Sequence, residues 1–197
     1  GTNLTLTSCV ANDRSTGLAL NSLHQGTVTS FTSRRSGIGI DIGGAATGTS
    51  TPPTLAGLDV RDSAVGLQVA WNATAWTLNN STVALNAANT LIGIQIKPNV
   101  ASSNLTFDGF VLPSRAFGLA GRVGASNITV RNCDLSGSGL GTGLVLNGTN
   151  LTVQNVTADH RAVGANLSGA TGVSINGLLA RHVATGLDLT TIGGALT

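Results

Sequence analysis

The feature that most constrains this chain is a short two-part repeat that returns along its length. The first part has the form Asn-apolar-Thr-apolar, and its clearest copies begin at Asn3, Asn104, Asn127 and Asn150. The second part follows it with the form Gly-apolar-x-apolar, and its copies begin at Gly17, Gly37, Gly66, Gly93, Gly118, Gly143, Gly164 and Gly186. Both parts alternate apolar with polar or small residues, as a β-strand with one buried face does. Closely spaced copies lie 22 or 23 residues apart, which predicts a solenoid, because one such unit cannot bury its apolar face alone.

Each repeat is expected to form one coil, with equivalent apolar residues stacked in the interior. The first part predicts one interior column, made of Leu6, Val28, Val60, Leu78, Phe107, Val130, Val153 and Ile175. The second part predicts another, made of Leu18, Ile38, Leu67, Ile94, Leu119, Leu144, Ala165 and Leu187. The wider steps of the first column contain residues 43–53 and 97–99, which are expected to be loops.

These patterns predict an all-β chain in which residues 1–197 form a single domain. The expected fold is a single-stranded right-handed parallel β-helix (a solenoid) of about eight coils, with 22–23 residues per regular coil. Two residues after each member of the first column the chain must turn, and small residues or Asn and Asp tolerate the left-handed backbone that a tight turn needs. The expected turn residues are Ser8, Ser30, Asp62, Asn80, Gly109, Asn132, Asn155 and Gly177.

The stretch from Asn127 to Gly137, which reads NITVRNCDLSG, resembles the parallel β-helix repeat of the pectate-lyase-like superfamily. This resemblance extends over essentially the whole chain. It implies the β-helix fold, but it is weak on activity, because that fold carries lyases, hydrolases, viral fibres, adhesins and inert spacers. In the enzymes of this family the active site lies on the outer face of the strand that corresponds to the second part of the repeat.

The composition excludes several classes of function. Only 9% of the residues are charged, the chain has no Glu, and Lys97 is its single lysine. The net charge of +2 gives no nucleic-acid-binding footprint. No run of 18 apolar residues is present, so no membrane span is predicted. No cofactor and no metal ion are predicted either.

Ten Asn-x-Ser/Thr sequons are candidates for N-glycosylation, at Asn3, Asn72, Asn79, Asn80, Asn104, Asn127, Asn147, Asn150, Asn155 and Asn166. They favour a secreted glycoprotein. The alternative is that the repeat itself favours Asn at a turn and Thr on an outer strand face, and the sequence leaves both open.

The expected outer face offers little catalytic chemistry. Its outward positions are Ala19, Gly39, Gln68, Gln95, Ala120, Val145, Asn166 and Asp188, with Asp41 at the end of the second coil's strand. Glycoside hydrolysis needs two carboxyl groups within roughly 5–9.5 Å of each other. Asp41 and Asp188 are expected six coils apart, or roughly 29 Å at about 4.8 Å per coil, so they cannot cooperate. We predict no catalytic residue on this face.

Two groups of polar residues are candidates for ligand binding. The first is a glycan groove formed by Gln68, Gln95, Asp41, Trp71 and Lys97, because amides and an aromatic ring suit sugars; the alternative is an ordinary ladder of glutamines. The second is a small acid/base or anion site, in which His160 is expected to stack on His182 and Asp159 on Arg181, with Arg161 nearby. Its alternative is a solvated turn surface with an ion pair between coils. His24 is expected to be an isolated surface residue.

The leading prediction of function is an extracellular structural or interaction rod without catalytic activity, as a component of a cell surface, filament or fibre. The expected localisation is extracellular, either secreted or on the surface of a cell or virion. The expected partners are other copies of the chain, bound end to end or laterally, or flanking domains of a longer chain. The alternative is a glycan-binding or polysaccharide-degrading protein.

Overall fold

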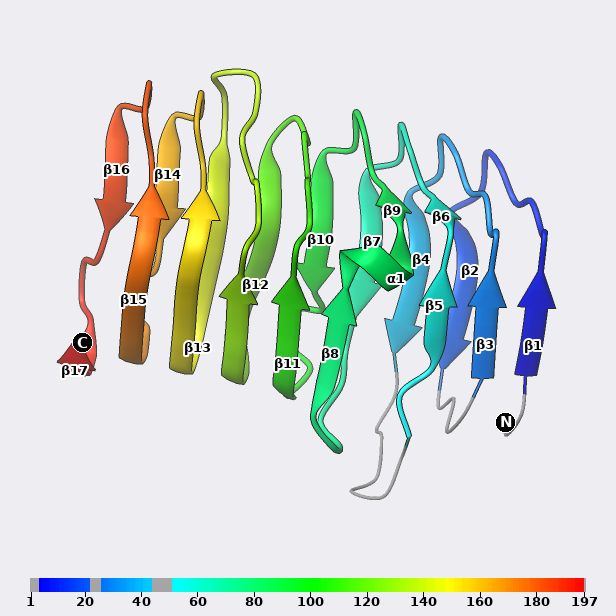
Figure 1. Ribbon diagram of the computed structural model, residues 1–197, viewed down its shortest axis with the longest axis horizontal. Coiled ribbons are helices and arrows are strands. Elements are labelled where there is room, and N and C mark those ends of the chain that lie inside the picture. Colours follow the sequence, from blue (N-terminus) through cyan, green and yellow to red (C-terminus); the bar gives the residue numbers. More distant parts are fainter. Residues whose placement is uncertain (1–3, 22–25, 44–50, 197) are drawn as a thin grey trace.

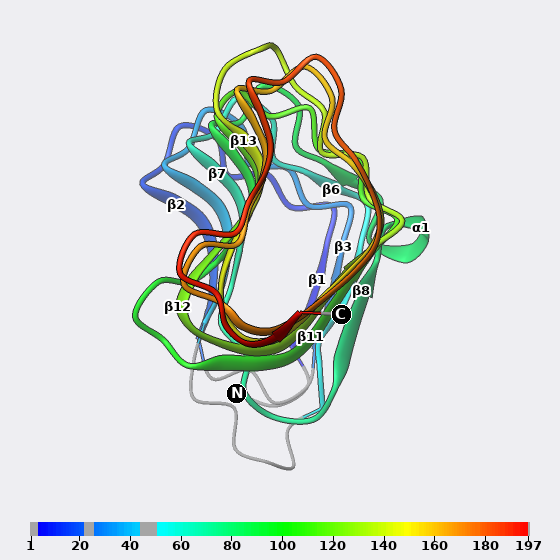
Figure 2. The ribbon, with the colours of Figure 1, turned by 90° about the vertical axis from the view of Figure 1, so that its left-hand side faces the viewer.

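The repeat folds into a stack of coils along one axis. A computed structural model describes residues 4–21, 26–43 and 51–196, with the side chains of 122–123 and 195–196 left out of the description. It is 56% strand and 2% helix and forms a parallel β-solenoid of about eight turns (Figure 1). Viewed along the axis, the coils surround a common centre (Figure 2). The predicted all-β solenoid of about eight coils is confirmed.

One side of the solenoid, which we call face A, is a continuous parallel sheet. Its strands in spatial order are β2 (Thr16–Asn21), β4 (Ile38–Gly43), β7 (Val65–Val69), β10 (Ile92–Ile96), β12 (Phe117–Arg131), β13 (Thr142–Thr157), β14 (Val163–Asn166) and β16 (Thr185–Asp188). The strands β12 and β13 are long enough to bend out of face A and to pair again on the other side of the coil.

That other side, face B, is made of two parallel sheets, and a narrow third side carries one short pair. The sheets of face B are β1 (Leu4–Thr7), β3 (Gly26–Thr29) and β5 (Thr54–Ala56), then β8 (Trp76–Asn79), β11 (Ser102–Asp108), the second halves of β12 and β13, β15 (Thr171–Leu179) and β17 (Gly193–Leu196). The third side pairs β6 (Leu58–Asp59) with β9 (Leu85–Asn86).

The interior column of face A is as predicted except at one position. The strand register stacks, in order, Leu18, Ile40, Leu67, Ile94, Leu119, Leu144, Ala165 and Leu187. The predicted member Ile38 is wrong, because Ile38 pairs with Thr16 and Ile40 takes the interior place. The stretch from Gly37 to Ile42 alternates over six residues, and a shift of two residues keeps the same face inward, so the pattern alone does not fix the register.

The interior column of face B also contains one error. Its two sheets stack Leu6, Val28 and Leu55, then Leu78, Phe107, Val130, Val153 and Ile175. Leu55 therefore replaces Val60, which lies directly after β6 on the third side and is fully buried there. Asp62 was predicted as a turn residue because it follows Val60 by two positions, so that prediction changes with Val60. The residue two positions after Leu55 is Gly57, which has a positive φ of 62°.

Positive-φ residues recur where the coil changes direction. Seven of the eight predicted turn residues have a positive φ, and six of these follow face B, namely Ser8, Ser30, Gly109, Asn132, Asn155 and Gly177. Asn80 instead begins the short helix α1 (Asn80–Val83). A second set lies three residues before the strands of face A, and its members are Asp13, Arg35, Asp62, Asn89, Gly139, His160 and His182. We call this second set the turn column.

Amide side chains connect successive coils at the turn that precedes face B. Asn150 donates a hydrogen bond from Nδ2 to Oδ1 of Asn127 at 3.1 Å, and Asn127 donates in the same way to Asn104 at 3.1 Å. All three have a positive φ, between 52° and 58°. Asn suits both demands, because it tolerates the left-handed conformation and offers one donor and one acceptor along the axis.

The stack is interrupted once on face B. The strand β5 pairs with β3 but not with β8, and α1 follows β8 directly. A cleft of about 260 Å³ lies between the two sheets, lined by Pro52, Pro53, Thr54, Leu55, Trp76, Thr77, Leu78, Asn79, Thr82 and Val83. Among the described residues no helix is long and apolar enough to cross a membrane.

The register of face B gives a direct test of the interior. Val130 is fully buried between Phe107 and Val153, so Val130→Asp places an unpaired charge in the column. We expect the free energy of unfolding in urea to fall by at least about 3 kcal/mol. Thr129→Asp on the outward side of the same strand is the control, and it should change that free energy by less than about 1 kcal/mol. Equal losses for the two variants would contradict the assigned inward face.

Candidate functional site

The polar residues of the predicted glycan groove lie in register on face A. Asp41 pairs with Gln68, and Gln68 pairs with Gln95, on three neighbouring strands. Asp41 thus takes the outward position that was predicted for Gly39, because of the same two-residue shift that exchanges Ile38 for Ile40. Gln68 donates a hydrogen bond from Nε2 to Oε1 of Gln95 at 2.6 Å. Their amides are therefore engaged with each other.

Lys97 forms an ion pair with Asp41, the first residue of this row. Its Nζ atom donates to Oδ2 of Asp41 at 2.8 Å, and the two side chains are 30% and 12% exposed. The other carboxylate oxygen of Asp41, Oδ1, is buried and has no hydrogen-bond partner among the described residues. The row therefore contains an ion pair with its carboxylate largely covered.

The aromatic platform expected for this groove is not exposed. Trp71 is only 3% exposed, and its indole N–H donates to the carbonyl oxygen of Thr74 at 2.7 Å. Its ring packs against Trp76, with ring centroids 5.2 Å apart. A sugar ring cannot stack on Trp71 in this position, so the prediction of an available ring is wrong and the geometry does not support the groove.

The carboxylates of face A are too far apart to act together. Asp41 and Asp188 occupy the same outward position, and six strand steps separate them through β7, β10, β12, β13, β14 and β16. At about 4.8 Å per step, that separation is roughly 29 Å. The hydrolytic pair that a glycosidase needs does not form between these two residues.

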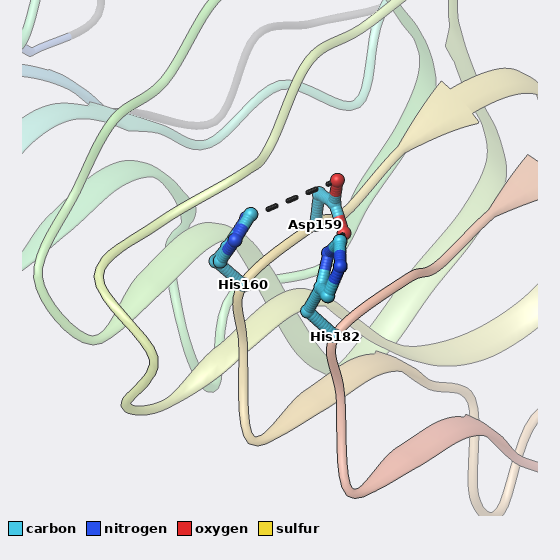
Figure 3. A group of neighbouring side chains, drawn as sticks. All are labelled: Asp159, His160 and His182. Carbon is cyan, nitrogen blue, oxygen red and sulfur yellow. Dashed lines mark hydrogen bonds and ion pairs between the residues drawn. The ribbon is translucent and has the colours of Figure 1, made fainter.

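A second group of polar residues lies in the turn column near the C-terminal end. His160 and His182 have positive φ values of 51° and 53° and occupy the same position in neighbouring coils. Their imidazole rings stack, with centroids 4.5 Å apart and an interplanar angle of 22°. The predicted stacking of the two histidines is therefore present. Figure 3 shows both rings beside the carboxylate of Asp159.

Asp159 is the common partner in this group. Its Oδ1 atom lies 3.2 Å from Nδ1 of His182, and its Oδ2 atom lies 3.8 Å from Nδ1 of His160 and 3.7 Å from Nε of Arg181. Desolvation by itself would raise the pKa of Asp159. The hydrogen bond from His182 and the nearby positive groups outweigh it and hold that pKa below its usual value. The carboxylate is therefore ionised at neutral pH, while both histidines and Arg181 are exposed.

Arg161 does not belong to this exposed group. Only 1% of the residue is exposed, and its guanidinium lies inside the solenoid. It donates from Nε to the carbonyl of Leu135 at 2.9 Å, from Nη1 to that of Ser114 at 2.8 Å and from Nη2 to that of Ser136 at 3.1 Å. Burial lowers the pKa of Arg161, and the nearby charge of Asp134 opposes this only in part. The backbone of two preceding coils therefore solvates this cation.

The sequence held one signal for the burial of Arg161. Gly137 lies against the guanidinium, and a Cβ atom there would overlap it. The residue thus makes room for a large side chain, but this relation is visible only once the coil register is known. Arg161 and Arg115 occupy equivalent positions of the repeat, and Arg115 is exposed. The repeat pattern by itself therefore predicts that both side chains lie on the surface.

The sequons divide into two groups. Those at Asn104, Asn127 and Asn150 begin copies of the repeat, and their amides form the ladder described above. Asn155 likewise donates to Asn132 of the previous coil at 3.3 Å. The ladder accounts physically for this recurrence of Asn. The other described sequons begin at Asn72, Asn79, Asn80, Asn147 and Asn166, and only Asn72 among them is exposed. Asn3 and His24 lie outside the described residues.

Comparisons with protein-family models, with curated proteins and with solved structures gave no match for this chain. The chemistry of its sites is therefore derived from its own residues.

The buried cation gives a testable prediction. Arg161→Leu removes the donors that satisfy three buried carbonyl groups, so we expect the free energy of unfolding to fall by about 3 kcal/mol. Arg115→Leu is the matched control at the exposed equivalent position and should cost less than about 1 kcal/mol. Urea unfolding followed by circular dichroism measures both. A larger loss for Arg115→Leu than for Arg161→Leu would refute the buried position.

Proposed function

We propose that this chain is part of a structural and interaction rod, located outside the cell or on its surface, in which its first and last described coils pair with further coils, either of another copy or of a flanking domain of a longer chain. The observation that carries the proposal is the state of the interior column at its two ends. Leu67 and Leu144 in the middle are fully buried, whereas Leu18 and Leu187, the first and last members, are only partly buried. A strand edge beside exposed core side chains favours pairing with a further strand.

The two ends are complementary to each other. All strand pairs are parallel and the coils surround a common centre (Figure 2), so the first coil of a second copy would continue the parallel strand order beyond the last coil of the first. Asp13 and His182 occupy the same place of the turn column in the first and last described coils. Head-to-tail stacking would therefore place the basic Arg181 and His182 beside Asp13 of the next copy, and such a contact propagates without closing.

Two further observations support a non-catalytic role outside the cell. The separation of Asp41 from Asp188 and the burial of Trp71 weaken the glycan-active alternative. The ten sequons fit a secreted protein, and among the described ones four have an exposed asparagine, at Asn72, Asn127, Asn150 and Asn155. The repeat resembles that of the pectate-lyase-like superfamily. We therefore also propose that the chain is related to this superfamily and that its solenoid winds right-handed, as the resemblance implies.

End-to-end stacking predicts a specific pattern of association. The 197-residue chain should form linear oligomers that grow with concentration, as measured by light scattering after size exclusion and by electron microscopy. Leu18→Asp blocks one end and Leu187→Asp blocks the other, so each variant alone should be monomeric. An equimolar mixture of the two variants should form dimers through the two intact ends, and should stop there.

Thr152→Asp, on the outward side of β13 in the middle of the rod, is the control and should associate as the unmodified chain does. A stable monomer at high concentration, or a mixture of the two end variants that stays monomeric, would contradict pairing between copies.

A further inference from the structure

The cluster at the C-terminal end of the turn column has a geometry that suits a metal ion better than it suits catalysis. We propose that His160, His182 and Asp159 together bind a divalent transition-metal ion of the Zn²⁺, Ni²⁺ or Cu²⁺ class. This inference is independent of the rod function, because it concerns one face of a single chain.

The distances are close to those of a coordination sphere. In a tetrahedral Zn²⁺ site with bonds of about 2.05 Å, neighbouring ligand atoms lie roughly 3.3 Å apart. The Asp159 oxygens lie 3.2 Å and 3.8 Å from the Nδ1 atoms of His182 and His160, and one ligand atom of each residue can be chosen so that all three lie within 4.8 Å of one another. The two imidazole rings are nearly parallel, so at least one of them must rotate before both lone pairs point at a single ion, and their exposure leaves room for that rotation.

The backbone holds the three residues in place, while the rings stay free to adjust. His160 donates its backbone N–H to the carbonyl of Arg181 at 3.1 Å, which fixes the two coils against each other. The side chains of His160 and His182 are 61% and 65% exposed, so they can rotate, whereas that of Asp159 is 15% exposed. A largely covered carboxylate and two exposed imidazoles at neighbouring turns form the ligand set of the proposed site (Figure 3).

The ligand set decides the class of metal. Two imidazoles and one carboxylate suit Zn²⁺, Ni²⁺ or Cu²⁺, whereas Ca²⁺ and Mg²⁺ prefer oxygen ligands only. Three protein ligands leave a fourth position for water. Because His160 and His182 come from neighbouring coils, the ion would also hold the last two described turns together, and ligands that bind only the folded state raise its stability.

Arg181 opposes the metal. Its Nε atom lies 3.7 Å from Oδ2 of Asp159 and therefore competes for one of the ligand oxygens. The side chain is 62% exposed and can move away, but its charge lowers the affinity of the site for a cation. Removing this charge should strengthen metal binding, whereas removing a ligand should weaken it.

Calorimetric titration of the 197-residue chain with ZnCl₂ tests the proposal. We expect one ion per chain with a dissociation constant below roughly 0.1 mM. His182→Ala and Asp159→Asn should each weaken binding by about tenfold or more, and Arg181→Gln should strengthen it. His24→Ala removes the one histidine outside the cluster and serves as the matched control, with binding unchanged. Circular dichroism confirms that each variant is folded.

A second readout separates a specific site from weak surface binding. Zn²⁺ should raise the thermal unfolding temperature of the unmodified chain and of Arg181→Gln but not of His182→Ala, and Mg²⁺ should have no effect. Equal binding by His182→Ala and the unmodified chain, a dissociation constant above roughly 1 mM, or loss of binding in His24→Ala would each overturn the assignment.

Discussion

Backbone hydrogen bonds between successive parallel coils are the interaction on which the rest of this structure depends. Among the described strands, none pairs with a strand of its own coil, so the hydrogen bonds of each strand go to the coil before it and the coil after it. Between β12 and β13, ten residue pairs on two faces of the coil are in register. The paired residues lie 25 positions apart in the sequence on face A and 23 positions apart on face B. Such a register places equivalent residues of successive coils next to each other, so the apolar positions of the repeat form interior columns of Leu, Ile and Val.

The same constraint explains the polar features. A residue at a left-handed turn is repeated one coil later, so side chains from that position form a line along the axis. Asn at this position yields the ladder of Asn104, Asn127 and Asn150, and His yields the stacked pair of His160 and His182. Opposite or complementary groups also meet in this way, as when Arg35 of one coil contacts Asp13 of the previous one at 2.7 Å. The solenoid therefore builds its candidate sites from lines of equivalent residues.

Most of the fold could be predicted from the sequence because the repeat is regular wherever both of its parts are complete. From Phe107 to Ile175 every member of the face B column was placed correctly. The errors at Ile38 and Val60 fall beside an irregular stretch, where an alternating pattern or an inserted loop allows more than one register.

The candidate sites were less predictable than the fold. Stacking of His160 on His182 follows from spacing alone and was anticipated. The burial of Arg161 and Trp71 was not, because periodicity tells which residues are equivalent but not which way a side chain at a corner points. Arg161 shows the difference: its charge suggested solvent, yet backbone carbonyls of neighbouring coils surround it.

Native-state hydrogen exchange of the 197-residue chain, resolved to single strands at low protein concentration, tests most directly whether pairing between successive coils holds this fold together. Protection should be greatest in β12 and β13, which have a coil on each side, and should fall toward β1 and β2 at one end and β16 and β17 at the other. Equal protection of the terminal and central strands in the monomer would contradict a solenoid whose end coils lack a partner.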